Sequence, residues 1–364
     1  MSIIPYSFTL VDGRRIDGQM LRSASSKEIT LLLHGFLDNS GSFSNLIPLL
    51  PSETFGTLIA LDLSGHGSSS HSSPDAYYTM ASSALDVSEI IISLLSSSPG
   101  ATSVHLIGHS MGTGVGLLVC SVLGAKISRF VMLDGLGPFT LVPGTDESSQ
   151  LLRDVLERRL KSKGRGVGAA PGAKAFATVL EAAERRAQQN LAGKMTTEEA
   201  MFLAVRALAM DKSSGTYSWS SDPRLLWPSV MRYSESSVLE MCGSVEADVL
   251  IVLGRQGLFK QLLNLGLGSK LRLGLFAFSK LVGLLLWVAS FFVKVKTSTA
   301  MRMGASMGKR VRAIRKKRVV LVEGGHHLHL AGEGAATVGK AIREWIGLEK
   351  SNTSTTSSSR EKTL

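Results

Sequence analysis

Short apolar runs of four or five residues, rich in β-branched side chains, recur along the chain between glycines, serines and aspartates. Such runs are typical of strands in a parallel sheet that is covered on both faces. They are residues 29–33, 57–61, 104–107, 130–133, 249–253 and 319–322. Because helix-like stretches separate most of them, the pattern predicts a doubly wound α/β sheet. Residues 6–10 and 15–21, joined at Asp12-Gly13, predict an antiparallel hairpin that leads into it.

The alternation of strands and helices breaks at residues 139–245, which have helical periodicity. The predicted helices are 150–161, 175–190 and 197–210. We expect 139–245 to form a helical cap over the carboxyl edge of the sheet. The core then consists of residues 1–138 and 246–347, and the Ser/Thr-rich residues 348–364 form a disordered tail.

The basic residues are concentrated in one segment. The chain has 40 Lys and Arg against 29 Asp and Glu, a net charge of +11. Residues 255–318 contain 15 basic and no acidic residues, which leaves 25 basic against 29 acidic residues elsewhere. The body of the protein is therefore mildly acidic, and 255–318 is a basic insert between the last two predicted strands.

Within this insert, residues 275–293 are apolar apart from Lys280, Gly283, Ser279 and Ser290, and are about as long as a membrane-spanning helix of ~20 residues. A single crossing would place the two flanking strands on opposite sides of the membrane, so they could not belong to one sheet. The remaining possibilities for this segment are an interfacial helix, a re-entrant hairpin and a helix packed on the cap. Because ten basic residues follow between Lys294 and Arg318, we expect 258–318 to dock on an anionic membrane surface. Aromatic residues are not interleaved with these charges, which disfavours nucleic acid as a partner.

Cysteine content and the two ends of the chain bear on localisation. Cys120 and Cys242 are too few for a disulfide framework or a cysteine-built metal site. Residues 1–18 show no secretory signal, so we expect a cytoplasmic protein, with peripheral membrane attachment as above. The terminal Lys362-Thr363-Leu364 is loosely similar to a peroxisomal address and leaves that compartment open.

The strand predicted at 104–107 runs into Gly108-His109-Ser110-Met111-Gly112, a Gly-x-Ser-x-Gly pattern followed by a helix of small residues. Glycines two positions either side of the serine permit a tight strand-to-helix turn in which a Cβ would collide with backbone. The turn exposes the Ser110 hydroxyl at a helix N-terminus, where developing negative charge is favoured. Ser110 is therefore the candidate nucleophile.

A second strand ends in His34-Gly35-Phe36. We expect the backbone N–H groups of Phe36 and Met111 to bind the oxyanion of a tetrahedral intermediate. For His34, a structural role in this loop is favoured over proton transfer.

Histidines follow the last predicted strand, in Gly325-His326-His327-Leu328-His329. A loop at the carboxyl edge can bring an imidazole within about 3 Å of Ser110, and His326 is preferred to His327 as the general base. His326 and His329 could instead share a face and bind a transition metal. Since no carboxylate or cysteine cluster lies nearby in the sequence, we predict no metal and no cofactor.

Together these segments resemble the α/β-hydrolase superfamily over residues 6–137 and 245–347. The order of motifs carries the resemblance: His34-Gly35, Asp62-Leu63-Ser64-Gly65-His66-Gly67, Gly108 to Gly112, and Gly325-His326. Within the superfamily the chain is most similar to serine hydrolase-like proteins, through residues 34–39, 133–138 and 215–225. The resemblance implies a mostly parallel eight-stranded sheet with helices on both faces and a helical cap, with Ser110 as nucleophile and His326 as base.

One position departs from the family pattern. Superfamily members usually carry the acid that orients the histidine after the penultimate strand, where this chain has Gly257. Some members carry it instead after the strand that follows the nucleophile helix, which here gives Asp134. Asp134 is the favoured acid. Asp248, Glu246 and a displaced acid that leaves the protein inactive are the alternatives.

These residues predict a serine hydrolase that cleaves a carboxylic ester, thioester or similar acyl substrate through an acyl-enzyme on Ser110. The alternative is a catalytically impaired α/β-hydrolase fold that serves as a binding or membrane-docking protein.

Overall fold

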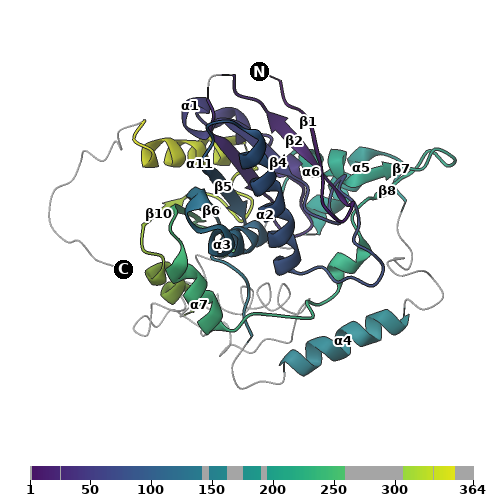
Figure 1. Ribbon diagram of the computed structural model, residues 1–364. Helices are drawn as coiled ribbons and strands as arrows, with labels where there is room; N and C mark the ends of the chain where they lie inside the picture. Colours follow the sequence, from purple (N-terminus) through teal and green to yellow (C-terminus); the bar gives the residue numbers. More distant parts are fainter. Residues whose placement is uncertain are drawn as a thin grey trace, which may run out of the picture.

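Eight strands form one sheet in the order β1-β2-β4-β3-β5-β6-β9-β10. The computed structural model describes residues 2–24, 26–141, 147–161, 175–189, 195–258, 306–330 and 332–348 (Figure 1). The strands are β1 (Ile4–Thr9), β2 (Arg15–Leu21), β3 (Ile29–Leu33), β4 (Thr57–Leu61), β5 (Val104–His109), β6 (Ile127–Leu133), β9 (Asp248–Gly254) and β10 (Lys317–Val322). Only the β1–β2 and β2–β4 pairs are antiparallel. The predicted mostly parallel, eight-stranded α/β sheet is confirmed.

Helices cover both faces of this sheet. One face packs against α2 (Met80–Ser97), α3 (Met111–Leu123) and α7 (Glu235–Ser244). The other packs against η1 (Ser40–Phe43), η2 (Ile47–Leu49), α1 (Ser52–Phe55) and α11 (Gly332–Trp345). Successive strand residues alternate between the two cores: Leu31 and Leu33 face the first, and Leu32 the second. Because side chains alternate along a strand, a sheet buried on both faces requires an apolar residue at each position.

Helix α2 has the length and apolar composition to cross a membrane, the one helix among the described residues that does. It packs against α3, and Ala84, Val87, Ile90 and Ile91 lie in the core beneath it. We therefore assign α2 to the core of the fold.

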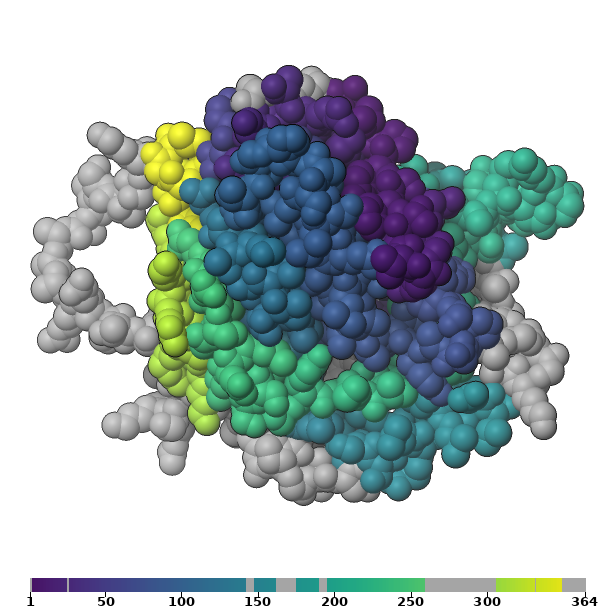
Figure 2. Space-filling model, in the orientation of Figure 1, coloured from purple at the N-terminus to yellow at the C-terminus, as the bar shows by residue number. Residues whose placement is uncertain are grey.

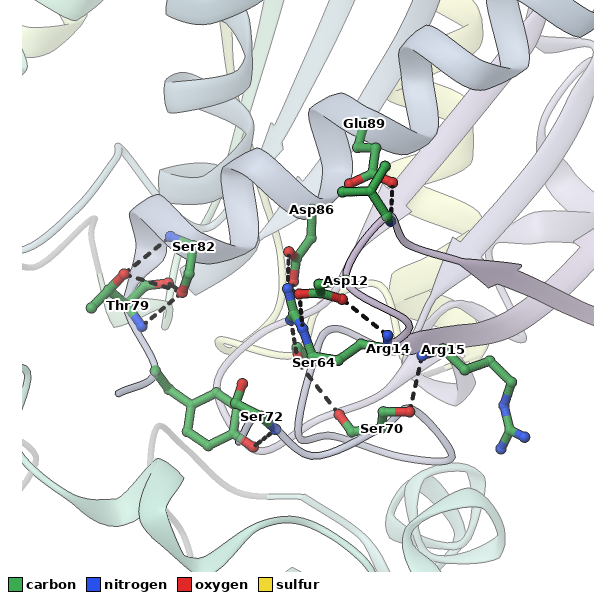
Figure 3. A network of polar contacts seen from close by, with 12 residues as sticks. Asp12, Arg14, Arg15, Ser64, Ser70, Ser72, Thr79, Ser82, Asp86 and Glu89 are labelled. Carbon is green, nitrogen blue, oxygen red and sulfur yellow. Dashed lines mark hydrogen bonds and ion pairs between the residues drawn. The ribbon is translucent and has the colours of Figure 1, made fainter. Parts of the chain in front are cut away.

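The predicted lead-in hairpin is present, and polar contacts attach it to α2 (Figure 3). Gly13 provides the left-handed backbone of the turn, with φ of 83°. The Arg14 guanidinium makes a bidentate pair with Asp86 of α2, at 2.7 and 2.8 Å, and donates to Ser64 Oγ at 3.0 Å. These bonds link the hairpin both to α2 and to the loop that follows β4.

Residues 139–245 contain most of the expected helices and one unexpected hairpin. The helices are α4 (Glu147–Lys161), α5 (Val179–Gln188) and α6 (Thr197–Ala207), followed by η4 (Pro223–Leu226) and α7. Outside this region, η3 (Gly124–Lys126) precedes β6. The prediction of helix through residue 210 is wrong, because β7 (Leu208–Met210) pairs with β8 (Tyr217–Trp219). The Asp211 carboxylate accepts the Ser213 amide at 2.9 Å and Gly215 adopts φ of 69°, so a turn forms where the helical pattern continued.

Part of the basic insert belongs to the core. Arg310, in the helical segment 306–313, is 1% exposed, donates from Nε to Glu235 of α7 at 2.9 Å and donates to the Pro138 carbonyl at 2.7 Å. It is therefore unavailable to a membrane, which corrects the interpretation of all ten basic residues between 294 and 318 as a surface cluster. Residues 275–293 and the tail at 349–364 lie outside the described residues.

Candidate active site

Ser110 lies at the turn between β5 and α3, in a conformation that few residues adopt. Its φ is 49° and its ψ is −111°. A Cβ on Gly108 would lie 2.6 Å from the Gly112 carbonyl oxygen, and one on Gly112 would lie 2.0 Å from that of Leu33. Both glycines are therefore required by space, as the sequence pattern predicted. The Ser110 amide donates to Leu133 O at 3.0 Å, which ties the strained turn to β6.

His326 stands beside this serine, in the loop that follows β10. Its Nε2 lies 2.9 Å from Ser110 Oγ although 216 positions separate the two residues, and the residue is 4% exposed. With Nδ1 as the donor to a carboxylate, Nε2 is left to accept a hydrogen bond from the Ser110 hydroxyl. The structure therefore places His326, and not His327, against Ser110.

Asp134 completes the chain of hydrogen bonds. It follows β6, is fully buried, and its Oδ2 accepts His326 Nδ1–H at 2.6 Å. The amides of Gly254 and Leu258 donate to the two carboxylate oxygens at 3.1 and 3.0 Å. A buried carboxylate with these partners can hold the imidazole in one tautomer and orientation.

Gly257, at the usual position of the acid, has no room for a side chain. A Cβ there would lie 2.3 Å from Asp134 Oδ1 and 2.6 Å from Oδ2. The carboxylate of Asp134 thus occupies the space that an acid after β9 would need, so the two positions exclude one another. The other candidate acids do not reach the histidine: Asp248 is exposed at the opposite end of β9, and Glu246 precedes that strand.

The loop after β3 contains the predicted oxyanion-binding amide of Phe36. Asp38 N–H donates to Gly35 O at 3.1 Å, and Leu37 adopts φ of 59°, so the chain bends sharply here. Met111 is the first residue of α3, where N–H groups lack partners within the helix. The role of these two amides stays a prediction.

His34 is a structural histidine, as the sequence reasoning favoured. It is fully buried; Nδ1–H donates to Gly35 O at 2.7 Å, and Nε2 accepts the Leu63 amide at 3.0 Å. Burial lowers the pKa of His34, so the ring stays neutral and joins the loop after β3 to the loop after β4.

Polar contacts tie α5 and α6 of the cap to these loops, and the sequence reasoning missed them. Arg186 of α5 pairs with Asp38 at 2.8 Å. Arg206 of α6 pairs with Asp62 at 2.7 Å. The Asn39 side chain donates to Leu203 O at 2.9 Å. The polar pair Asp38-Asn39, which closely follows His34-Gly35 in the sequence, could have indicated that this loop makes polar contacts.

A tight turn in the cap, at Asp222-Pro223-Arg224, contacts the core. Asp222 pairs with Arg224 at 2.6 Å, and the Asp222 amide donates to Gly65 O at 2.9 Å. The turn therefore joins the cap to the loop after β4.

Comparisons with known proteins agree with the fold described above. A family model described as the alpha/beta hydrolase fold matches residues 30–199. The chain is 27% identical over 238 residues to a serine hydrolase-like protein of Danio rerio, covering 63% of this chain and 66% of that protein. It is 34% identical over 122 residues to a serine hydrolase-like protein of Homo sapiens, covering 34% of this chain and 55% of that protein. The matches thus span less than two thirds of either relative. A solved hypothetical protein of Pseudomonas aeruginosa PAO1 is similar in fold, with a TM-score of 0.69 and 27% identity, covering 94% of this chain and 99% of that chain.

Proposed function

Because this chain belongs to the α/β-hydrolase superfamily and is similar to serine hydrolase-like proteins, we propose that it is a serine hydrolase acting on an acyl substrate through Ser110. The substrate class is a carboxylic ester, a thioester or a related acyl compound. Serine at the elbow favours these substrates, because it attacks a carbonyl carbon and forms an acyl-enzyme.

The reaction proceeds in two half-reactions. His326 Nε2 takes the hydroxyl proton as Ser110 Oγ bonds to the carbonyl carbon, and the amides of Phe36 and Met111 bind the resulting oxyanion. The leaving group departs with the proton from His326. Water then adds to the acyl-enzyme with His326 again as base, and the acid product leaves Ser110. Asp134 holds the imidazole throughout.

One observation supports this proposal most directly: hydrogen bonds of 2.9 and 2.6 Å connect Ser110, His326 and Asp134 from three separate loops at one edge of the sheet. The rival proposal, a catalytically silent binding protein, has no need for a strained serine within reach of an oriented imidazole.

A fluorophosphonate probe tests the proposal. The full chain is expected to be labelled, with the adduct on Ser110 by mass spectrometry and no labelling of Ser110→Ala. Ser128→Ala is the matched control, because Ser128 Oγ lies 2.7 Å from His105 Nδ1 but is on β6 and not at a strand-to-helix elbow. An unlabelled chain, or a label that survives Ser110→Ala, would contradict the proposal.

A second candidate function, docking on an anionic membrane surface, has support from α4. Leu152, Leu156 and Leu160 are spaced four residues apart and are 55–62% exposed. They share one face of the helix, and Arg153, Arg158 and Lys161 lie on the same helix. Figure 2 shows α4 at the lower edge of the molecule. We propose that this leucine face and its cations insert into the headgroup region, alongside the predicted docking of residues 258–318 other than the buried Arg310.

Liposome flotation tests the role of α4. Leu152→Ser/Leu156→Ser/Leu160→Ser is expected to weaken binding to phosphatidylserine-containing vesicles at least about 100-fold, since each fully buried leucine contributes about 1.5–3 kcal/mol. Leu85→Ser, at an exposed leucine on α2, is the control and should float like the unchanged protein. Unaltered flotation of the triple variant would exclude α4 as a docking element.

A further inference from the structure

A second cluster of chemically active side chains lies behind the Ser110–His326 pair. Asp38 follows β3, His109 ends β5, and His327 follows β10. Their carboxylate and ring-nitrogen atoms all lie within 4.8 Å of one another. Asp38 and His109 are buried, and the His327 side chain is 11% exposed. The proposed hydrolytic mechanism uses none of these three side chains.

The hydrogen bonds of His109 leave an unusual arrangement. Its Nε2 lies 2.9 Å from the His326 carbonyl oxygen, so Nε2 carries the proton. In this tautomer the ring's lone pair lies on Nδ1. This nitrogen is buried, has no hydrogen-bond partner among the described residues, and lies 3.6 Å from Asp38 Oδ2.

Asp38 faces this lone pair with a negative charge. Arg186 binds Oδ1 at 2.8 Å, whereas Oδ2 faces the two histidines. Two electron-pair donors thus face each other in a buried site, an arrangement that a cation between them would stabilise.

Two of the three donor separations are close to those around a zinc-like ion, and the third, between the two histidine nitrogens, lies within 4.8 Å. Asp38 Oδ2 lies 3.2 Å from His327 Nε2 and 3.6 Å from His109 Nδ1. Ligands about 2.0–2.1 Å from a tetrahedral zinc ion are separated by roughly 3.4 Å. We propose that Asp38 Oδ2, His109 Nδ1 and His327 Nε2 bind one divalent transition-metal ion of the zinc class, with water as the fourth ligand.

The surroundings of the three ligands suit this role. Metal-binding histidines usually donate their second ring N–H to a backbone carbonyl or carboxylate, which fixes the tautomer, and His109 makes such a bond to His326. Arg186 orients the carboxylate in the same way. The partly exposed ring of His327 provides a route of entry. The proposal is independent of the hydrolase function, because it requires no catalytic step.

Zinc binding to the full chain provides the test. After removal of metals with a chelator, the protein is dialysed against ZnCl₂ and its bound zinc is measured by mass spectrometry; about one equivalent is expected. His327→Gln and Asp38→Asn should each weaken the affinity at least about tenfold, since each removes one of three ligands. His71→Gln is the control, because the His71 side chain is 48% exposed and lies outside the cluster.

A stability measurement separates loss of a ligand from loss of the fold. Zinc is expected to raise the thermal unfolding temperature of the unchanged protein and of His71→Gln, but not that of His327→Gln. His327→Gln remains informative if Asp38→Asn fails to fold, since Asp38 also holds Arg186. No bound zinc in the unchanged protein, or equal zinc binding by folded His327→Gln, would overturn the proposal.

Discussion

With glutamine in place of His326, kcat for hydrolysis of a p-nitrophenyl ester is expected to fall about 10⁶-fold, the loss typical when a serine hydrolase loses its nucleophile or its base. The reason is geometric: His326 Nε2 is 2.9 Å from Ser110 Oγ, and glutamine cannot accept the hydroxyl proton there. The measurement is steady-state hydrolysis, with the circular dichroism spectrum compared to confirm folding.

His327→Gln distinguishes the two histidines that the sequence left as alternatives. His327 Nε2 faces Asp38 at 3.2 Å and not Ser110, so this variant is expected to lose only a small fraction of that activity. Equal losses for the two variants would show that His326 is not the specific base.

Asp134→Asn is expected to lower kcat about 10⁴-fold, because an amide cannot stabilise the imidazolium and favours the wrong tautomer. The effect should fall on kcat, since Asp134 is fully buried and acts through His326. Asp248→Asn is the matched control: Asp248 is exposed at the far end of β9, and kcat should be unchanged. Small and equal losses in the two variants would refute the assignment of Asp134.

A compensating pair of substitutions tests the same assignment by gain of activity. Gly257→Asp alone should impair the protein, since its Cβ would lie 2.3 Å from the Asp134 carboxylate. Asp134→Gly removes that carboxylate, and glycine accepts the backbone φ of 41° at this position. We expect Asp134→Gly/Gly257→Asp to recover turnover relative to Asp134→Gly alone. No recovery by a folded double variant would mean that space is not what excludes an acid at 257.

Much of the fold and the serine elbow could be predicted because both follow from patterns of neighbouring residues. The apolar runs fell within the strands because a doubly covered sheet needs an apolar residue at each position, and neighbouring residues satisfy that demand. The elbow was predictable because its Gly-x-Ser-x-Gly pattern lies within five consecutive residues, although the contact that requires glycine at 112 is with Leu33 of β3. The helix at 197–210 was predicted too long, because pairing with β8 is a contact between segments.

The acid and the second cluster depended on contacts that no local pattern records. The sequence left Asp134, Asp248 and Glu246 as candidate acids, and only the structure shows that Asp134 reaches His326 and that its carboxylate fills the space beside Gly257. Asp38 precedes His327 by 289 positions in the sequence, yet in the fold its carboxylate lies 3.2 Å from that histidine. No carboxylate close to His327 in the sequence makes this contact.

By itself, the sequence determined the sheet, the elbow at Ser110 and the loop that carries His326, since hydrophobic periodicity and the turn motif are patterns of a few neighbouring residues. Only the tertiary structure decided which carboxylate hydrogen-bonds to His326 and which side chains surround His109. The packing of parallel strands brings their carboxyl ends to one edge whatever the distance between them along the chain.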